Sequence, residues 1–146
     1  MSYLKLLTQL KTEELLEKTF KAGILPNDGG IIAGFPETII SFNEEEFYLF
    51  IFEGIFRPKY DYKHQFKFSE IRGIEMGKYH FKNHYLKLIF EDDKYFVFNY
   101  FYRVKGAPKQ SENVKAFIDK LTALATIVEK ETEGWKKTID KVVWIW

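Results

Sequence analysis

The order of the sequence patterns constrains the fold of this chain more than any single motif does. Short aromatic runs typical of β-strands, separated by polar turns, fill residues 38–100. One amphipathic helix is then predicted over residues 111–130. Its apolar stripe has helical spacing and consists of Val114, Phe117, Ile118, Leu121, Leu124, Ala125 and Val128. Consecutive strands closed by one helix predict an α+β, mainly β domain, built as a curled sheet or small barrel with a helical plug.

Two segments of the β-region carry the strongest local signals. Residues 85–90 and 95–98, joined through Asp92 and Asp93, predict a β-hairpin. Residues 47–52 are apolar at every position, which is typical of a strand that is covered on both faces. We therefore expect an N-terminal helix or a partner to cover the second face of that strand.

The N-terminal region predicts helix and then a linker. Leucines and Phe20 recur at helical spacing, so we expect one helix, or two short ones, over residues 3–21. Pro26-Asn27-Asp28-Gly29-Gly30 has the composition of a linker. The expected organisation is therefore an N-terminal helical extension (1–25), a barrel domain (30–130) and a basic, aromatic C-terminal tail (131–146).

Composition excludes several function classes. The 22 basic and 21 acidic residues leave a net charge of +1, which argues against a dedicated nucleic-acid-binding protein. The absence of cysteine excludes disulfides, thiol nucleophiles and cysteine-based zinc sites. Residues 1–10 lack the apolar core of a signal peptide, and no stretch approaches the ~20 apolar residues that span a bilayer. We expect a cytoplasmic protein.

No motif in the sequence predicts catalysis. There is no Walker loop, dinucleotide-binding glycine pattern or Ser-His-Asp order. His80 and His84 bracket a turn, but their segment offers no third metal ligand. Acidic clusters at residues 44–46 and 92–93 are explained by turn formation. We therefore predict that the protein is not an enzyme and has no catalytic residue, metal or cofactor.

Two basic, aromatic segments are candidates for an interaction surface. The segment around residues 57–67 suits an anionic headgroup or phosphate, although alternating lysines also protect an edge strand from pairing. The tail suits a short interfacial helix, but we favour its packing on its own domain or on a second copy. The predicted interaction surface consists of Arg57, Lys59, Tyr60, Lys63 and Lys67 together with Trp135, Trp144 and Trp146.

The region from about Gly30 to Ala125 resembles the bacterial pleckstrin-homology-like domains, which are related to the GRAM-type domains. The resemblance is carried by the polar corner Phe68-Ser69-Glu70-Ile71 before Ile74-Glu75, the hairpin at residues 86–98, and the helical motif Ala116-Phe117-Ile118-Asp119-Lys120-Leu121. It implies a barrel of two nearly orthogonal antiparallel sheets, with the C-terminal helix plugging one open end. That superfold hosts lipid binding, peptide binding and scaffolding, so it does not define a function.

The sequence departs from the family at the lipid site. Phosphoinositide-binding members carry basic residues on the first two strands and on the loop between them. Here that loop is Pro36-Glu37 or residues 43–46, and neither is basic. The leading hypothesis is therefore a non-catalytic interaction module that binds a protein partner or self-associates through residues 47–52 and the tail. A peripheral membrane module using the basic strand face and the tail is the alternative, and a small-ligand carrier is the third.

Overall fold

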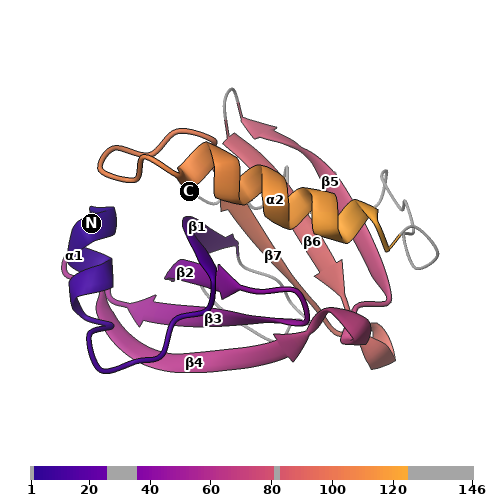
Figure 1. Cartoon of the computed structure of the whole chain (residues 1–146), viewed down its shortest axis with the longest axis horizontal. Coiled ribbons are helices and arrows are strands. Elements are labelled where there is room, and N and C mark those ends of the chain that lie inside the picture. The colour runs from indigo at the N-terminus through magenta and orange to yellow at the C-terminus, as the bar shows by residue number, and fades with distance from the viewer. Residues whose placement is uncertain (1, 26–35, 81–82, 125–146) are drawn as a thin grey trace.

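The computed structural model describes residues 2–25, 36–80 and 83–124, with a short helix before the strands and a longer one after them (Figure 1). The elements in chain order are α1 (Tyr3–Thr8), β1 (Lys18–Leu25), β2 (Glu37–Phe42), β3 (Glu46–Glu53), β4 (Lys59–Lys67), the 3₁₀ turn η1 (Phe68–Glu70), β5 (Gly73–His80), β6 (Asn83–Ile89), the 3₁₀ turn η2 (Glu91–Asp93), β7 (Tyr95–Tyr100) and α2 (Gln110–Thr122).

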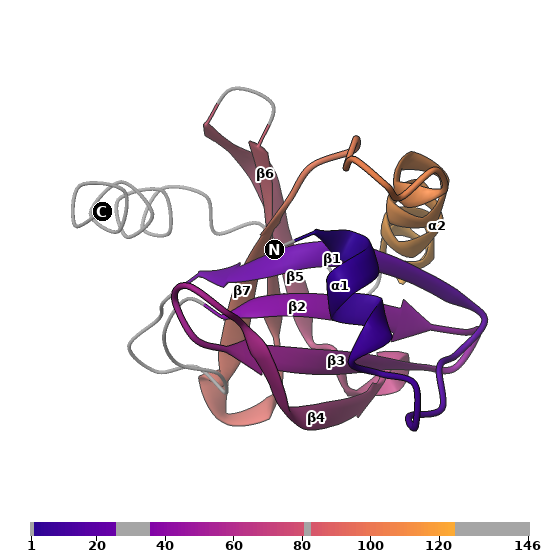
Figure 2. The ribbon, with the colours of Figure 1, turned by 90° about the vertical axis from the view of Figure 1, so that its left-hand side faces the viewer.

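The strands form one antiparallel, seven-stranded sheet in the order β4-β3-β2-β1-β7-β6-β5. β1 joins the two halves, because residues 18–23 pair with β2 whereas residues 23–25 pair with β7. Strands β2–β4 run across the direction of β5–β7 (Figures 1 and 2). The prediction of a mainly β, α+β fold with a C-terminal helix is confirmed, as is the β6–β7 hairpin.

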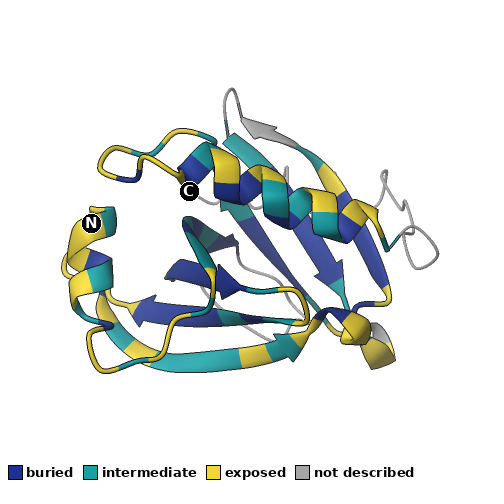
Figure 3. Ribbon diagram, in the orientation of Figure 1, coloured by how far each residue is buried: buried dark blue, intermediate teal, exposed yellow. Residues whose placement is uncertain are grey.

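The main core lies between the curled sheet and α2 (Figure 3). Val114, Phe117 and Leu121 of α2 are buried, and they contact inward-facing side chains from both halves of the sheet. The strands contribute every second residue, since side chains alternate between faces. Among the buried strand residues are Phe20, Phe42, Phe47, Leu49, Leu86, Phe96 and Phe98.

Helix α1 covers the opposite face of the first half of the sheet. Leu6 and Leu10 pack on Ile39, Phe50 and Phe52, all of which are buried. The expectation that an N-terminal helix covers the second face of residues 47–52 is confirmed. That apolar face therefore no longer supports self-association, and the remaining support, the tail at residues 131–146, lies outside the described residues.

The predicted helix over residues 3–21 is wrong beyond Thr8. Residues 18–25 form β1, so this part of the expected helical extension belongs to the sheet. Phe20, Ala22 and Ile24 enter the core with a period of two, and backbone hydrogen bonds to two neighbouring strands outweigh the local helical spacing. The linker at residues 26–30 and the predicted helix beyond Leu124 lie outside the described residues.

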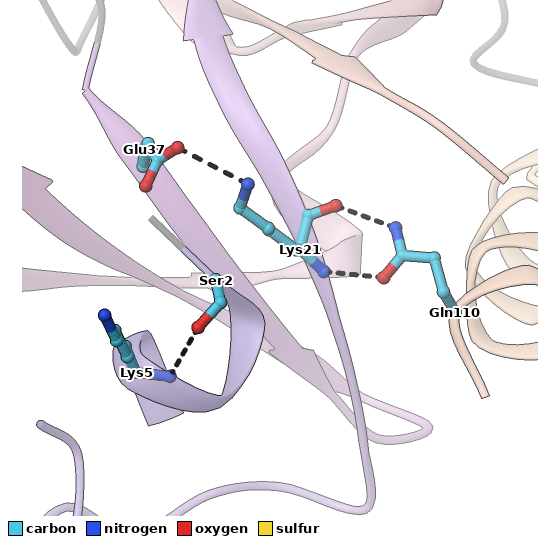
Figure 4. Close-up of polar contacts among 5 residues, drawn as sticks. All are labelled: Ser2, Lys5, Lys21, Glu37 and Gln110. Carbon is cyan, nitrogen blue, oxygen red and sulfur yellow. Dashed lines mark hydrogen bonds and ion pairs between the residues drawn. The ribbon is translucent and has the colours of Figure 1, made fainter. Parts of the chain in front are cut away.

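Two polar side chains of α2 attach the helix to the part of β1 that does not pair with β7. Gln110 is 2% exposed; its Nε2 donates to the carbonyl oxygen of Lys21 and its Oε1 accepts from the amide of Lys21, both at 2.9 Å (Figure 4). Its Nε2 also donates to the carbonyl oxygen of Phe101 at 3.0 Å. One turn later, Nδ2 of Asn113 donates to the carbonyl oxygen of Thr19 at 2.7 Å. These bonds give α2 partners among the partly buried backbone groups of β1 and of Phe101.

Candidate interaction surface

The loop between β3 and β4 carries two exposed apolar side chains. Ile55 and Phe56 are 92% and 94% exposed, more than any other large apolar side chain among the described residues. We call them the loop-tip pair. Full exposure of both leaves them outside the core, so they add little to the stability of the folded chain.

The base of this loop is fixed at both ends. Gly54 adopts a φ of +122°, and a Cβ added there would lie 3.0 Å from the carbonyl oxygen of Arg57, so the turn favours glycine. Pro58 is buried at the other end and restricts the backbone. The loop-tip pair is therefore presented on a short, constrained turn.

Helix α1 holds the same loop base through Gln9. Its Nε2 donates to the carbonyl oxygen of Pro58 at 2.9 Å, and its Oε1 accepts from the amide of Tyr60 at 2.8 Å. Ser2 is the N-cap of α1, and its hydroxyl accepts from the amide of Lys5 at 3.3 Å (Figure 4). Residues some fifty positions apart in the chain, α1 and the β3–β4 loop, thus form one continuous surface.

An open groove of about 940 Å³ lies between α1 and the loop. Three of its lining side chains, Lys5, Arg57 and Lys59, are exposed cations, and the described lining contains no acidic residue. Gln9, Phe56, Pro58 and Tyr60 complete the lining. We call this feature the basic groove.

The structure brings together only some of the predicted surface residues. Arg57, Lys59 and Tyr60 meet in the basic groove. Lys63 points onto the ring of Tyr48, with its Nζ 4.5 Å from the ring centroid. Lys67 lies at the other end of β4, roughly 26 Å away along an extended strand. Trp135, Trp144 and Trp146 lie outside the described residues.

Tyr60 lines the groove, but its ring packs against other aromatic rings of the domain. Its ring lies 5.9 Å from that of Phe50 and 5.8 Å from that of Phe52. Burial, followed by the hydrogen bond to Glu13 and the charge of that carboxylate, raises the pKa of Tyr60 to about 12. Tyr60 therefore stays neutral at physiological pH. The charge of the groove comes from its cations.

Three members of this surface were missed by the sequence reasoning. Lys5 and Gln9 come from a helix far away in sequence, and no local pattern connects them with the loop. Ile55 had a signal that was not used. It lies with Phe56 between Gly54 and Pro58, where a turn places large apolar side chains in solvent.

A second polar cluster lies on strands β5–β7. The hydroxyl of Tyr85 donates to Oε2 of Glu75 at 3.3 Å, and Nζ of Lys87 lies 4.5 Å from the ring centroid of Tyr95. Burial and the neighbouring Glu75 carboxylate raise the pKa of Tyr85. Glu75 and Lys87 are only 3% and 8% exposed, so this cluster does not face a substrate from solution.

The acidic turn after β2 has a structural explanation. Oδ1 of Asn43 accepts from the amides of Glu45 and Glu46, both at 2.9 Å, and Glu44 pairs with Lys120 of α2 at 2.9 Å.

His84 packs against Tyr100, and the centroids of the two rings lie 5.5 Å apart. Within the described ranges, no three His, Asp or Glu side chains gather closely enough to hold a metal ion.

Comparison with known proteins identifies a similar fold. No protein-family model matches this sequence, and no curated protein sequence matches it. Among solved structures, the chain is similar to one described as the hSac2 domain from human phosphoinositide phosphatase Sac2. The TM-score is 0.52 and the identity 10%, with 89% of each chain covered. At this identity the similarity concerns the fold alone.

Across the described residues, none of the helices is both long and apolar enough to cross a membrane.

Proposed function

We propose that this chain is a pleckstrin-homology-like interaction module, without catalytic activity, that binds its partner through the loop-tip pair and the basic groove. The strand order, the crossing of β2–β4 with β5–β7 and the placement of α2 support a barrel of two nearly orthogonal sheets. The similar solved structure supports the same arrangement of elements. A cytoplasmic location is part of this proposal, whereas nucleic acid is not an expected partner at a net charge of +1.

The exposure of the loop-tip pair carries this proposal. Two adjacent large apolar side chains more than nine-tenths in solvent form a contact feature that folding does not use. Gly54 and Gln9 hold the loop in place, so little conformational entropy is lost when a partner binds. The adjacent cations then bias the choice of partner.

Site-specific photo-cross-linking tests this proposal. A benzophenone amino acid replaces Phe56 in one full-length variant and Ser69, an exposed residue at the far end of β4, in the matched control. In whole extract with membranes, we expect adducts from position 56 that excess unlabelled wild-type protein suppresses. Excess Ile55→Ser/Phe56→Ser double variant should not suppress them. Equal adducts at both positions, or none at position 56, would contradict the proposal.

A further inference from the structure

We infer that the partner of this surface is an anionic membrane, into which Ile55 and Phe56 insert while Lys5, Arg57 and Lys59 contact the lipid headgroups. This inference rests on the proposed function and names the class of its partner. The proposed membrane contact does not involve the C-terminal tail at residues 131–146, which lies outside the described residues.

The shape of the surface favours a bilayer. The loop-tip pair projects from a turn only five residues long, Gly54 to Pro58, and Phe56 alone of the pair lines the open groove. A protein partner would have to provide a cavity matched to both side chains. A bilayer accepts projecting apolar side chains without any matching shape, because its interior is fluid and apolar.

The positive charges next to the tip suit a contact with anionic lipid headgroups. Arg57 and Lys59 both follow the tip along the chain, and Lys5 of α1 lines the basic groove with them. Cations next to apolar side chains bind anionic lipid surfaces, since both attractions act at the same depth. The chain as a whole is nearly neutral, so the attraction has to come from this local arrangement.

Acidic residues lie beside two members of the basic groove. Glu13 forms a hydrogen bond with Tyr60. Glu53 pairs in register with Lys59, and Asp61 follows at the bulge of β4. Burial and then the charges of Glu53 and Asp61 raise the pKa of Tyr62, which packs against the core inside the barrel. None of these carboxylates is among the described lining of the groove, whose charged residues are Lys5, Arg57 and Lys59.

The openness of the groove favours a general anionic surface over one particular lipid. No described side chain encloses a headgroup there, because the three cations are all exposed at the rim. Phosphatidylserine and a phosphoinositide should therefore bind according to charge, without stereochemical preference.

Vesicle co-sedimentation of the full-length chain tests the inference. The vesicles contain phosphatidylcholine alone or with about 30% phosphatidylserine. We expect binding only to the anionic vesicles, with most of it lost in about 0.5 M salt, where charges are screened within a few ångströms. A third set replaces phosphatidylserine with a phosphoinositide at equal total charge and should bind equally.

Matched variants separate the tip and its charges from the rest of the surface. Ile55→Ser/Phe56→Ser should lose about tenfold or more in partitioning, as should Arg57→Glu/Lys59→Glu. The apolar control Leu4→Ser/Phe101→Ser and the charge control Lys94→Glu/Lys115→Glu alter side chains that are also exposed. Both controls should stay within about threefold of wild type, which is below the effect of one cation near an anionic membrane.

Failure of this inference is distinguishable from failure of the proposed function. Wild-type protein that ignores anionic vesicles but gives competed protein adducts at position 56 would overturn the membrane inference and keep the interaction surface. Loop variants that bind vesicles like wild type would also overturn the inference. Absence of both vesicle binding and competed adducts would remove both proposals.

Discussion

Aromatic side chains occur in two contrasting regions of this molecule, the core beneath α2 and the tip of the β3–β4 loop. Phe117 of α2 is 1% exposed, and its ring lies 5.1–6.2 Å from five other rings. Those rings belong to Phe20, Phe42, Phe47, Phe68 and Phe98. Phe56 is almost wholly in solvent. The same residue type therefore stabilises the fold in one region and is available for binding in the other.

Each of the two helices is attached to neighbouring backbone through one glutamine side chain, with different consequences. Gln110 of α2 and Gln9, next to α1, each bond one backbone amide and at least one backbone carbonyl. Gln110 bonds both groups of Lys21 in β1, and Gln9 bonds the amide of Tyr60 in β4 and the carbonyl of Pro58 in the loop before it. Gln110 is buried and holds a helix in the core, whereas Gln9 is half-buried and holds the loop that carries the tip. Changes near α2 should thus lower stability, and changes at the loop should alter binding.

The largest expected effect on the free energy of unfolding comes from a substitution in the core beneath α2. Phe117→Ala should lower the free energy of unfolding by about 3–5 kcal/mol, because it removes the ring that contacts five others and leaves a cavity. Urea denaturation measures this, with the exposed Lys115→Ala as control. A loss below about 0.5 kcal/mol would contradict the role of α2 as a plug, since surface substitutions fall in that range.

Gln110→Ala should cost about 1–3 kcal/mol, because the partly buried amide of Lys21 and the carbonyls of Lys21 and Phe101 lose their partner. The exposed neighbour Glu112→Ala is the matched control. Amide hydrogen exchange should show faster exchange at Lys21 in the Gln110 variant, and unchanged protection there would argue against the proposed contact.

Alkaline pH tests the packing beneath the basic groove. The pKa of Tyr60 is about 12 in the folded chain, against an ordinary value of 10.0, so folding favours the neutral phenol. Its contribution to stability is complete below pH 10 and is lost as the pH rises towards 12. Tyr60→Phe should therefore lose less stability over this interval than wild type does. Unfolding curves at several pH values measure the difference, and parallel losses would show that Tyr60 is not buried as described.

The smallest expected effect on stability is at the loop tip. Ile55→Ser/Phe56→Ser should change the free energy of unfolding by no more than about 0.5 kcal/mol, because neither side chain contributes to the core. Thermal and urea unfolding would both measure this. A loss comparable to that of the Phe117 variant would mean that the tip packs somewhere, and the contrast between the two regions would disappear.

Local patterns were sufficient to predict much of the fold. The β6–β7 hairpin and α2 were recognisable because their signals lie within short windows, as turn residues or an apolar stripe. β1 was mistaken for helix because its evidence is distant. It is a strand through pairing with β2 and with residues 97–99, which the sequence around Phe20 does not reveal.

The candidate site was predictable only along one strand. Arg57, Lys59 and Tyr60 are neighbours in sequence and meet in the groove. A β-bulge in the β3–β4 pairing directs Tyr60 towards α1 and Tyr62 into the core, which regular alternation does not anticipate. The contribution of Lys5 depends on α1 packing against β3, a long-range contact without a local signal.

The most direct test of the account places a fluorescent probe at the loop tip. The chain contains no cysteine, so Phe56→Cys and, as control, Ser69→Cys can each be labelled at one position with an environment-sensitive fluorophore. On addition of anionic vesicles, we expect a blue shift and a brighter signal at position 56 and no change at position 69, because only the tip enters the apolar layer. An unchanged spectrum at position 56, or equal changes at both positions, would contradict the claim that the loop tip enters the membrane.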